Sequence, residues 1–288
     1  MTIKIVSRSS KLALAQVQEF IDVFSIKEYE LINIKTRGDI LSSQGEVLFD
    51  KANFVSDIEK SLIEEKADVA IHSAKDMPAE DTEYLNQLFF AKGEERVVSD
   101  LLIFRKDTEP VFDINMKLGT SSLRRKMQAK FHLKAKNIMD LNGNIDTRIR
   151  KLNEGIYDCI ILAEAGLSRL QYLLEDQNYI RLNHLTCSGQ GALAVQWKNE
   201  NKFSDIIMST DISSSAINLS DEINIEKSLL KKLNTNCNSA ISLIARNGLL
   251  KGEIFGLKNY ISFSGDQVDE VYKDIKENRG LELLNEHH

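Results

Sequence analysis

The stretch Ala67-Asp68-Val69-Ala70-Ile71-His72-Ser73-Ala74-Lys75-Asp76-Met77-Pro78 decides how this chain folds and where its chemistry lies. Its apolar first part, residues 67–71, predicts a buried strand that follows an amphipathic helix expected over residues 54–65. The strand therefore ends by delivering Asp76 into a turn closed by one of the chain's two prolines. Ligands of open α/β sheets bind beyond the carboxyl ends of the strands, so Asp76 is a candidate catalytic acid. The alternative is an ordinary turn-forming aspartate.

The composition narrows the class of protein. The chain has 288 residues, 42% of them hydrophobic and 28% charged, which is typical of a soluble globular protein of two or three domains. Its net charge of −6 argues against nucleic acid or an anionic membrane as a partner. A strand-like start and the lack of a membrane-length apolar run predict a cytoplasmic protein. His287 and His288 are either native or a fragment of a tag.

Cysteine usage excludes two further classes. The three cysteines, Cys159, Cys187 and Cys237, show no CxxC or Cys/His spacing, so neither a disulfide framework nor a metal site is expected. Cys159 lies in an apolar stretch that predicts a buried strand, where a thiol is an inert core residue. Cys187 precedes a glycine turn and belongs to no recognised motif.

Strand and helix patterns alternate up to about residue 200, which predicts α/β domains with mostly parallel sheets and helices on both faces. The pattern strand-Ser7-Arg8-Ser9-Ser10-helix recurs at Gly119-Thr120-Ser121-Ser122-Leu123-Arg124-Arg125. This indicates either an internal duplication or convergent loops. From about residue 214 the pattern changes to a helix, three strands with an Asn247-Gly248 hairpin signal, and a helix. A small separate α+β domain is therefore expected there.

The second of these loops has the features of an anion site. A helix expected to start at Leu123 would present free N–H groups, Thr120 and Ser122 to a carboxylate or phosphate. Arg124 and Arg125 in its first turn oppose the helix dipole, which favours a polyanionic ligand gripped by the two guanidiniums. The alternative is two solvated surface arginines. Gly189-Gln190-Gly191 has no phosphate-loop lysine, so nucleotide binding is not expected.

Taken together, these motifs resemble those of the porphobilinogen deaminase (hydroxymethylbilane synthase) family. The matching segments occur in the family's order and span almost the whole chain: Ser7–Ala13, Thr36–Asp39, His72–Pro78, Gly119–Arg125, Gly143–Arg148 and Gly189–Ala192.

The resemblance implies a three-domain enzyme of haem biosynthesis. Residues 1–92 with 192–211 would form the first domain, residues 97–187 the second, and residues 214–288 the third. The first two would resemble type II periplasmic binding proteins, and the third would hold a three-stranded antiparallel sheet with helices. The implied reaction joins four porphobilinogens head to tail, with loss of ammonia, onto a covalent dipyrromethane cofactor. Hydrolysis then releases linear hydroxymethylbilane.

The resemblance also implies roles for individual residues. Asp76 would be the catalytic acid, stabilising cationic pyrrole species and relaying protons. Cys237 would hold the dipyrromethane through a thioether. The implied cofactor-binding residues are Ser73, Lys75, Thr120, Ser122, Arg124, Arg125, Arg148 and Gln190. The implied substrate-binding residues are Arg8, Ser10, Lys51, Phe54 and Arg169. Porphobilinogen is the expected partner; no metal is implied, and a monomer is expected.

The chain departs from the family pattern in three places. Asn142 stands where the family's Arg-Gly-Asn motif supplies an arginine. The loop at residues 50–54 lacks the usual glycines, although Lys51 and Phe54 match. The loop around Cys237 lacks two preceding glycines and a following proline. Two other hypotheses therefore stay open: a degenerate homologue that binds pyrroles without turnover, and a small-anion receptor on the same fold.

The cysteine assignment gives a direct test. We expect Cys237→Ser to yield folded protein without covalent dipyrromethane and with negligible activity, because the serine hydroxyl is a far weaker nucleophile than a thiol. Intact mass spectrometry checks this by the presence or loss of a two-pyrrole adduct. Retention of the full adduct would move the attachment to Cys159 or Cys187.

Overall fold

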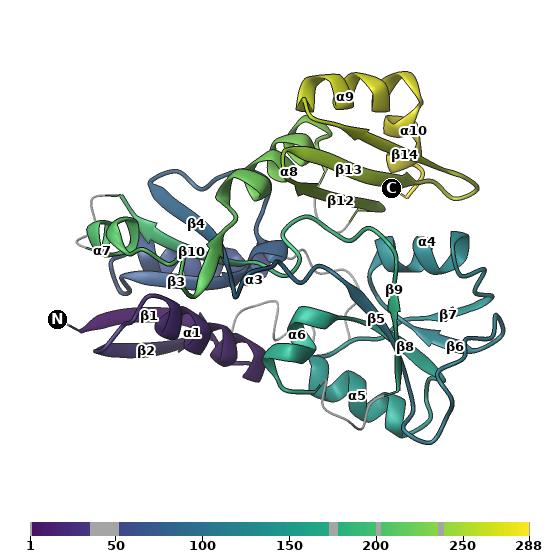
Figure 1. The fold of residues 1–288 in the computed structure, drawn as a ribbon, viewed down its shortest axis with the longest axis horizontal. Helices are drawn as coiled ribbons and strands as arrows, with labels where there is room; N and C mark the ends of the chain where they lie inside the picture. The colour runs from purple at the N-terminus through teal and green to yellow at the C-terminus, as the bar shows by residue number, and fades with distance from the viewer. Residues whose placement is uncertain (1, 35–51, 173–177, 200–202, 236–238, 288) are drawn as a thin grey trace. The chain divides into compact units, whose positions relative to one another are not determined.

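The computed structural model describes residues 2–34, 52–172, 178–199, 203–235 and 239–287. The chain divides into two compact units (Figure 1). Unit 1 comprises Met1–Val97 and Gly189–Asn224, and unit 2 comprises Val98–Ser188 and Ile225–His288.

Unit 1 is built on a six-stranded mixed sheet with the order β11-β4-β10-β3-β1-β2 among its described residues. Strands β1 to β4 all run in one direction, whereas β10 and β11 run the opposite way. The elements are β1 (Ile3–Arg8), α1 (Lys11–Val23), β2 (Tyr29–Ile34), α3 (Ala52–Ile63), β3 (Val69–Ser73), the 3-10 turn η1 (Ala74–Asp76), β4 (Leu85–Lys92), β10 (Leu193–Lys198), α7 (Ser204–Ser209), β11 (Ala216–Asn218) and the start of α8 (Ser220–Lys232).

Strands β1 and β3 carry apolar side chains on both faces of this sheet, and a helix covers each face. Ile5 and Ile71 pack with Phe20 of α1 on one face. Their neighbours Val6 and Ala70 pack with Ile58 of α3 on the other. Successive strand residues point to opposite faces, so the period of two in β1 and β3 fixes which helix each strand residue meets.

Unit 2 repeats this plan with a five-stranded sheet of order β7-β6-β8-β5-β9 among its described residues. Ile103 and Ile160 pack with α5 and α6 on one face, and Phe104 and Ile161 pack with α4 on the other. The elements are β5 (Asp100–Phe104), β6 (Lys117–Gly119), α4 (Leu123–Phe131), β7 (Asn137–Met139), α5 (Ile145–Asn153), β8 (Cys159–Ala163), α6 (Glu164–Arg169) and β9 (Tyr179–Leu182).

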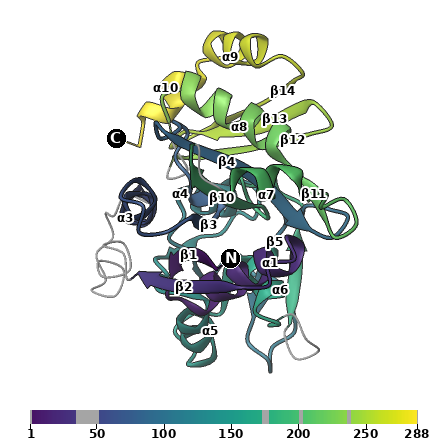
Figure 2. The ribbon, with the colours of Figure 1, turned by 90° about the vertical axis from the view of Figure 1, so that its left-hand side faces the viewer.

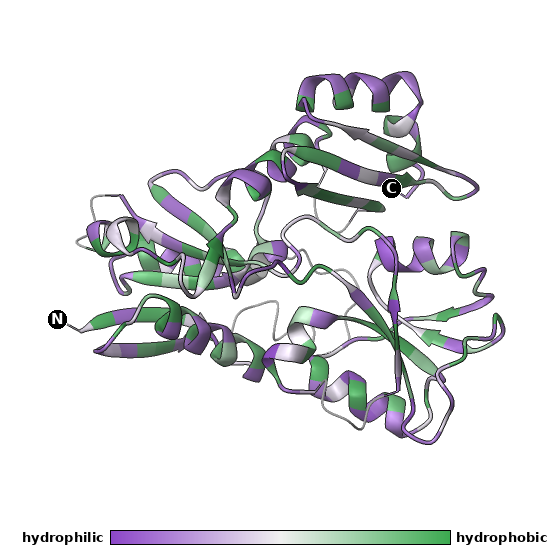
Figure 3. Ribbon diagram, viewed as in Figure 1, coloured by the Kyte–Doolittle hydropathy of each residue, from purple (hydrophilic) through white to green (hydrophobic). Residues whose placement is uncertain are grey.

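A second, three-stranded antiparallel sheet completes unit 2. It consists of β12 (Ile241–Arg246), β13 (Leu249–Phe255) and β14 (Tyr260–Gly265). Helices α9 (Val268–Glu277) and α10 (Gly280–Asn285) pack against β13 and β14 (Figures 1 and 2). In Figure 3, α9 turns its green residues toward the sheet and its purple residues away, which matches its buried Val271 and Ile275. An amphipathic helix of this kind is held by packing more than by propensity.

The fold class predicted from the sequence is confirmed: two α/β sheets and a three-stranded antiparallel sheet with helices. The expectation of mostly parallel sheets needs a correction, because β10 and β5 pair antiparallel with both of their neighbours. Each is the first strand after the chain passes between the units, so each enters its sheet from the end at which the neighbouring strands finish. The division into three domains stays a prediction. No helix among the described residues is long and apolar enough to cross a membrane.

Candidate functional site

Asp76 lies in a short turn that directly follows strand β3. The turn η1 begins at Ala74, whose amide donates to the carbonyl of Ala192 at 3.0 Å. The Met77 amide closes the turn by donating to the Ala74 carbonyl at 3.1 Å. Two backbone hydrogen bonds therefore fix the conformation from which the Asp76 carboxylate projects.

A glycine turn from a distant part of the sequence packs directly against the backbone of η1. Gly189 has φ +71°, and a Cβ built there would lie 2.5 Å from the Ala74 carbonyl carbon and 2.5 Å from the Lys75 nitrogen. The next residue, Gln190, accepts a hydrogen bond at its carbonyl from Nε of the buried Arg96 at 2.8 Å. Glycine is required here because no side chain fits between the two backbones.

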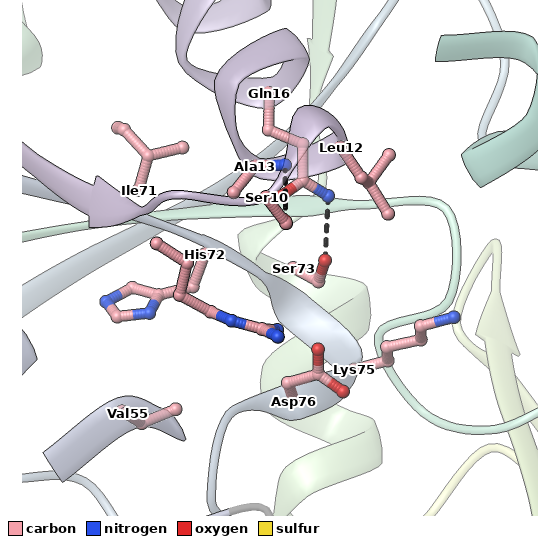
Figure 4. Close-up of a pocket in the computed structure, with 11 residues that line it drawn as sticks. Ser10, Leu12, Ala13, Gln16, Val55, Ile71, His72, Ser73, Lys75 and Asp76 are labelled. Carbon is pink, nitrogen blue, oxygen red and sulfur yellow. Dashed lines mark hydrogen bonds between the residues drawn. The ribbon is translucent and has the colours of Figure 1, made fainter. Parts of the chain in front are cut away.

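The residues before the turn shape a small pocket that contains five of the predicted site residues. The Ser73 hydroxyl accepts from the buried Gln16 amide at 2.7 Å, and Ser10 caps α1 by accepting from the Ala13 amide at 3.2 Å. Figure 4 shows the Gln16–Ser73 bond above the Asp76 carboxylate, with the Lys75 side chain extending away. The predicted residues that line this pocket are Arg8, Ser10, Ser73, Lys75 and Asp76.

The pocket also contains His72, which the sequence placed in the motif without a role. Its side chain is buried, and burial lowers its pKa from 6.5 to about 4, although the Asp76 carboxylate and the Gln196 amide act in the opposite direction. His72 is therefore neutral at physiological pH. The pocket thus combines a carboxylate, two cationic side chains and an uncharged imidazole.

The predicted anion site lies in unit 2 at the start of α4. Ser122 caps this helix and accepts from the Arg125 amide at 3.5 Å. Arg124 and Arg125 are buried, which contradicts the alternative of two solvated surface arginines. Both bind Asp100 on β5: Arg124 Nη1 lies 2.8 Å from Oδ2, and Arg125 Nη2 lies 2.6 Å from Oδ1. The buried carboxylate compensates for removing these cations from water.

This cluster keeps a surplus of positive charge. Burial opposes the charge on Arg124, but Asp100 and Cys187 together outweigh it, so the pKa of that guanidinium is raised. Arg125 also donates from Nη1 to the Ile161 carbonyl at 3.2 Å. Two guanidiniums share one carboxylate, and two buried polar atoms at the start of α4 have no hydrogen-bond partner, namely Thr120 Oγ1 and Arg124 Nε. Buried unpartnered polar atoms of this kind call for a ligand or another explanation.

Asn142 lies beside this site, and a lysine side chain contacts its backbone. Its Oδ1 accepts from the Ser121 hydroxyl at 2.8 Å, and its carbonyl accepts from Lys151 Nζ at 3.2 Å. Arg150 is exposed and pairs with Glu154 at 2.5 Å, so Lys151 is the cation next to Asn142. Arg148, also on α5, donates from Nε to the Gly143 carbonyl at 2.7 Å.

Five predicted site residues remain, together with the two other cysteines. Gln190 is fully buried, and Arg169 lies in the last turn of α6. Phe54 belongs to α3. Lys51 and Cys237 lie outside the described residues. Cys159 is buried in β8, and burial raises the pKa of its thiol to about 12, as expected for an inert core residue. Cys187 contacts Arg124.

Three supporting residues were missed by the sequence analysis: Gln16, Arg96 and Asp100. Asp100 stands at the start of an apolar strand and Gln16 on an amphipathic helix, and neither position carries a local signal of its distant partner. Within the described residues, no group of three or more His, Cys, Asp or Glu side chains could hold a metal ion.

Comparisons with known proteins agree with these motifs. A family model described as "Porphobilinogen deaminase, dipyromethane cofactor binding domain" matches residues 3–205. A porphobilinogen deaminase of Streptococcus sanguinis is 35% identical over 262 residues, covering 85% of this chain and 83% of that protein. A probable porphobilinogen deaminase of Methanocaldococcus jannaschii is 33% identical over 296 residues, covering 98% and 100%. Among solved structures, a periplasmic binding protein of Salmonella typhimurium with high arginine specificity has a TM-score of 0.38 at 12% identity, covering 80% and 93%.

The close approach at Gly189 gives a stability test with a matched control. Gly93 also has a positive φ, +87°, but a Cβ there would meet nothing within 4 Å. We expect Gly93→Ala to cost about 1–2 kcal/mol of backbone strain. Gly189→Ala should cost roughly 1–3 kcal/mol more, because its methyl group overlaps the Ala74 and Lys75 backbone. It should also speed hydrogen exchange at the Ala74 amide.

Urea unfolding and amide exchange check both variants. Equal destabilisation of the two, with unchanged exchange at Ala74, would mean that Gly189 does not support the Asp76 turn.

Proposed function

The chain belongs to the porphobilinogen deaminase family, and we propose that its reaction takes place at the Asp76 pocket of unit 1. The activity is that of the family: it condenses porphobilinogen with loss of ammonia in tetrapyrrole biosynthesis, with a dipyrromethane cofactor. The product, by family resemblance, is linear hydroxymethylbilane built from four porphobilinogen units. The residue roles below are our proposal.

One observation supports this placement above all: a rigidly held carboxylate shares a pocket with two cationic side chains. Asp76 projects from a turn fixed by backbone hydrogen bonds, and Arg8 and Lys75 line the same pocket. Porphobilinogen carries an acetate, a propionate, a pyrrole N–H and an aminomethyl group. Arg8 and Lys75 suit its carboxylates, and Asp76 suits its N–H and amine groups.

The proposed role of Asp76 follows from the charge that the reaction creates. Loss of ammonia from porphobilinogen leaves a cationic, electron-poor pyrrole, and a preorganised carboxylate lowers the free energy of that charge. The same carboxylate can carry a proton toward the leaving amine and take one from the ring carbon that reacts. Stabilising the cation and taking a proton from the ring carbon both need an ionised carboxylate at a fixed position, and the hydrogen-bonded turn fixes the backbone that carries it.

The start of α4 in unit 2 fits the carboxylates of the cofactor. The Arg124–Asp100–Arg125 cluster keeps surplus positive charge, and Thr120 Oγ1 and Arg124 Nε are buried without partners. When bound, the dipyrromethane supplies the pyrrole carbon onto which the first substrate unit is joined. We propose that Thr120, Ser122, Arg124, Arg125 and Arg148 hold its carboxylates. By family resemblance alone, Ser73, Lys75 and Gln190 remain predicted cofactor-binding residues, and Cys237 remains the predicted point of attachment.

Other parts of the proposal rest on the sequence alone. Ser10, Arg169, Lys51 and Phe54 remain predicted substrate-binding residues, alongside Arg8. The monomeric state, the cytoplasmic location and the division into three domains likewise stay predictions.

The role of Asp76 can be tested with an isosteric change. Asp76→Asn keeps the shape of the side chain and removes its charge, so we expect kcat for porphobilinogen consumption to fall about 10²- to 10³-fold with an unchanged melting temperature. Glu80→Gln, an exposed acid four residues along the chain, serves as the matched control. Near-normal kcat in Asp76→Asn would place the condensation chemistry on another residue.

A second prediction concerns the position where the family's arginine is replaced. We expect Asn142→Arg to lower KM for porphobilinogen about tenfold, because an arginine adds a bidentate partner for a carboxylate. Steady-state kinetics measure the effect. An unchanged KM would mean that Lys151, which already contacts Asn142, supplies the charge. In that case Lys151→Met should raise KM, and the double variant should restore it.

A further inference from the structure

A line of buried polar side chains runs behind the Asp76 pocket. Glu59 of α3 is 7% exposed, Gln196 of β10 is 2% exposed and His72 of β3 is 6% exposed. Glu59 Oε1 accepts from Gln196 Nε2 at 2.9 Å and from the Thr82 hydroxyl at 2.9 Å. A buried carboxylate inside a helix–sheet layer is costly unless it is well hydrogen-bonded, so this arrangement needs a reason.

The sheet register brings Gln196 and His72 onto the same face. Gln196 stands opposite Ala70 in the β10–β3 ladder, and Ala194 stands opposite His72. Gln196 and His72 are therefore diagonal neighbours, a separation that long side chains can bridge. In keeping with this diagonal placement, the Gln196 amide acts to raise the pKa of His72.

The carboxylate of Glu59 decides which way the Gln196 amide faces. An ionised carboxylate only accepts hydrogen bonds, so the NH₂ group of Gln196 must point to Glu59 and its carbonyl oxygen is left for His72. In the structure, Gln196 Oε1 and His72 Nε2 are both buried without a partner at hydrogen-bonding geometry. An acceptor facing a ring nitrogen is satisfied only if that nitrogen carries the proton.

We infer that Glu59 and Gln196 fix His72 as the neutral tautomer protonated at Nε2, which makes His72 a positioning residue for the Asp76 pocket. Its Nδ1 is then an uncharged acceptor. This inference deepens the proposed function and rests on it only for its kinetic consequence. A neutral imidazole does not weaken the negative electrostatic potential of the Asp76 carboxylate. An imidazolium four residues away would compete with the cationic substrate for that carboxylate.

The charged groups around His72 come from each element that packs against it. Asp76 lies on η1, Arg8 on β1, and Glu59 on α3 acts through Gln196 on β10. Asp76 favours the protonated imidazole, whereas burial and Arg8 oppose it. Burial keeps the imidazole neutral but is compatible with a proton on either ring nitrogen. The orientation of the Gln196 amide therefore decides which neutral tautomer is present.

Nitrogen-15 NMR of histidine-labelled protein reads the tautomer directly and does not depend on turnover. The chain has five histidines, and His72→Asn assigns the His72 signals. We expect the wild-type Nε2 to show the shift of a protonated nitrogen and Nδ1 that of an unprotonated one, unchanged from pH 8 to pH 5.5. Observation of an Nδ1–H tautomer or of an imidazolium at pH 7 would overturn the inference, whatever the activity.

Two variants separate positioning from simple structural support. Glu59→Gln lets the Gln196 amide turn over, so we expect mixed His72 tautomers and a kcat lowered about tenfold with little change in KM. Thr82→Ala removes the other donor to Glu59 and should leave both the tautomer and kcat unchanged. If Glu59→Gln keeps the wild-type tautomer, Glu59 does not orient the amide and the inference fails. If Asp76→Asn keeps full activity while the tautomer is as expected, only the proposed role of Asp76 fails.

Discussion

The hydrogen bond from the Ala74 amide to the Ala192 carbonyl joins the two segments of unit 1 at the turn that carries Asp76, the proposed catalytic residue. Strand β3 carries the Asp76 turn, and β10, from more than a hundred residues further along the chain, lies beside it in the sheet. The pairing places Gly189 against the turn and brings Gln196 beside His72. The precision of the site is therefore a property of the sheet, because an element held in a ladder moves less than a free loop.

In unit 2, a buried ion-pair cluster ties the start of α4 to strand β5. Arg124 and Arg125 would each be costly in the core without Asp100, and removal of one partner from such a cluster costs about 3–5 kcal/mol. A substitution at Asp100 is thus expected to act on folding as much as on ligand binding. This distinguishes the predicted anion site from the pocket of unit 1, where Asp76 and Lys75 are only partly buried.

Much of the fold could be predicted because its signals are local. The helix starts at Ser10 and Ser122 follow from capping serines, and both serine side chains accept hydrogen bonds from the first turn. The Asn247-Gly248 hairpin has the positive φ angles, 51° and 75°, that this dipeptide favours. The turn that carries Asp76 could be predicted because a strand, a charge and a proline coincide within a dozen residues.

The supporting contacts could not be predicted, because each one depends on a pairing between distant segments. Asp100 and Arg124 are far apart in the sequence, and nothing local to β5 indicates that a guanidinium lies above it. The choice between Arg150 and Lys151 as the cation beside Asn142 depends on the phase of α5, which turns Arg150 toward Glu154 and solvent. The reversed direction of β10 and β5 likewise follows from chain connectivity between units and not from strand composition.

The position of β10 in the middle of its sheet has a consequence for synthesis on the ribosome. Strands β3 and β4, which flank it, emerge first and lack their shared neighbour until residues 193–198 have been made. The five-stranded sheet of unit 2 comes from one continuous segment, residues 100–182, and can close earlier. Vectorial folding therefore leaves one edge of β3 and both edges of β4 unpaired in the nascent unit 1, because β11, the other neighbour of β4, is made later still. Unpaired strand edges of this kind expose the nascent sheet to mispairing until the chain returns.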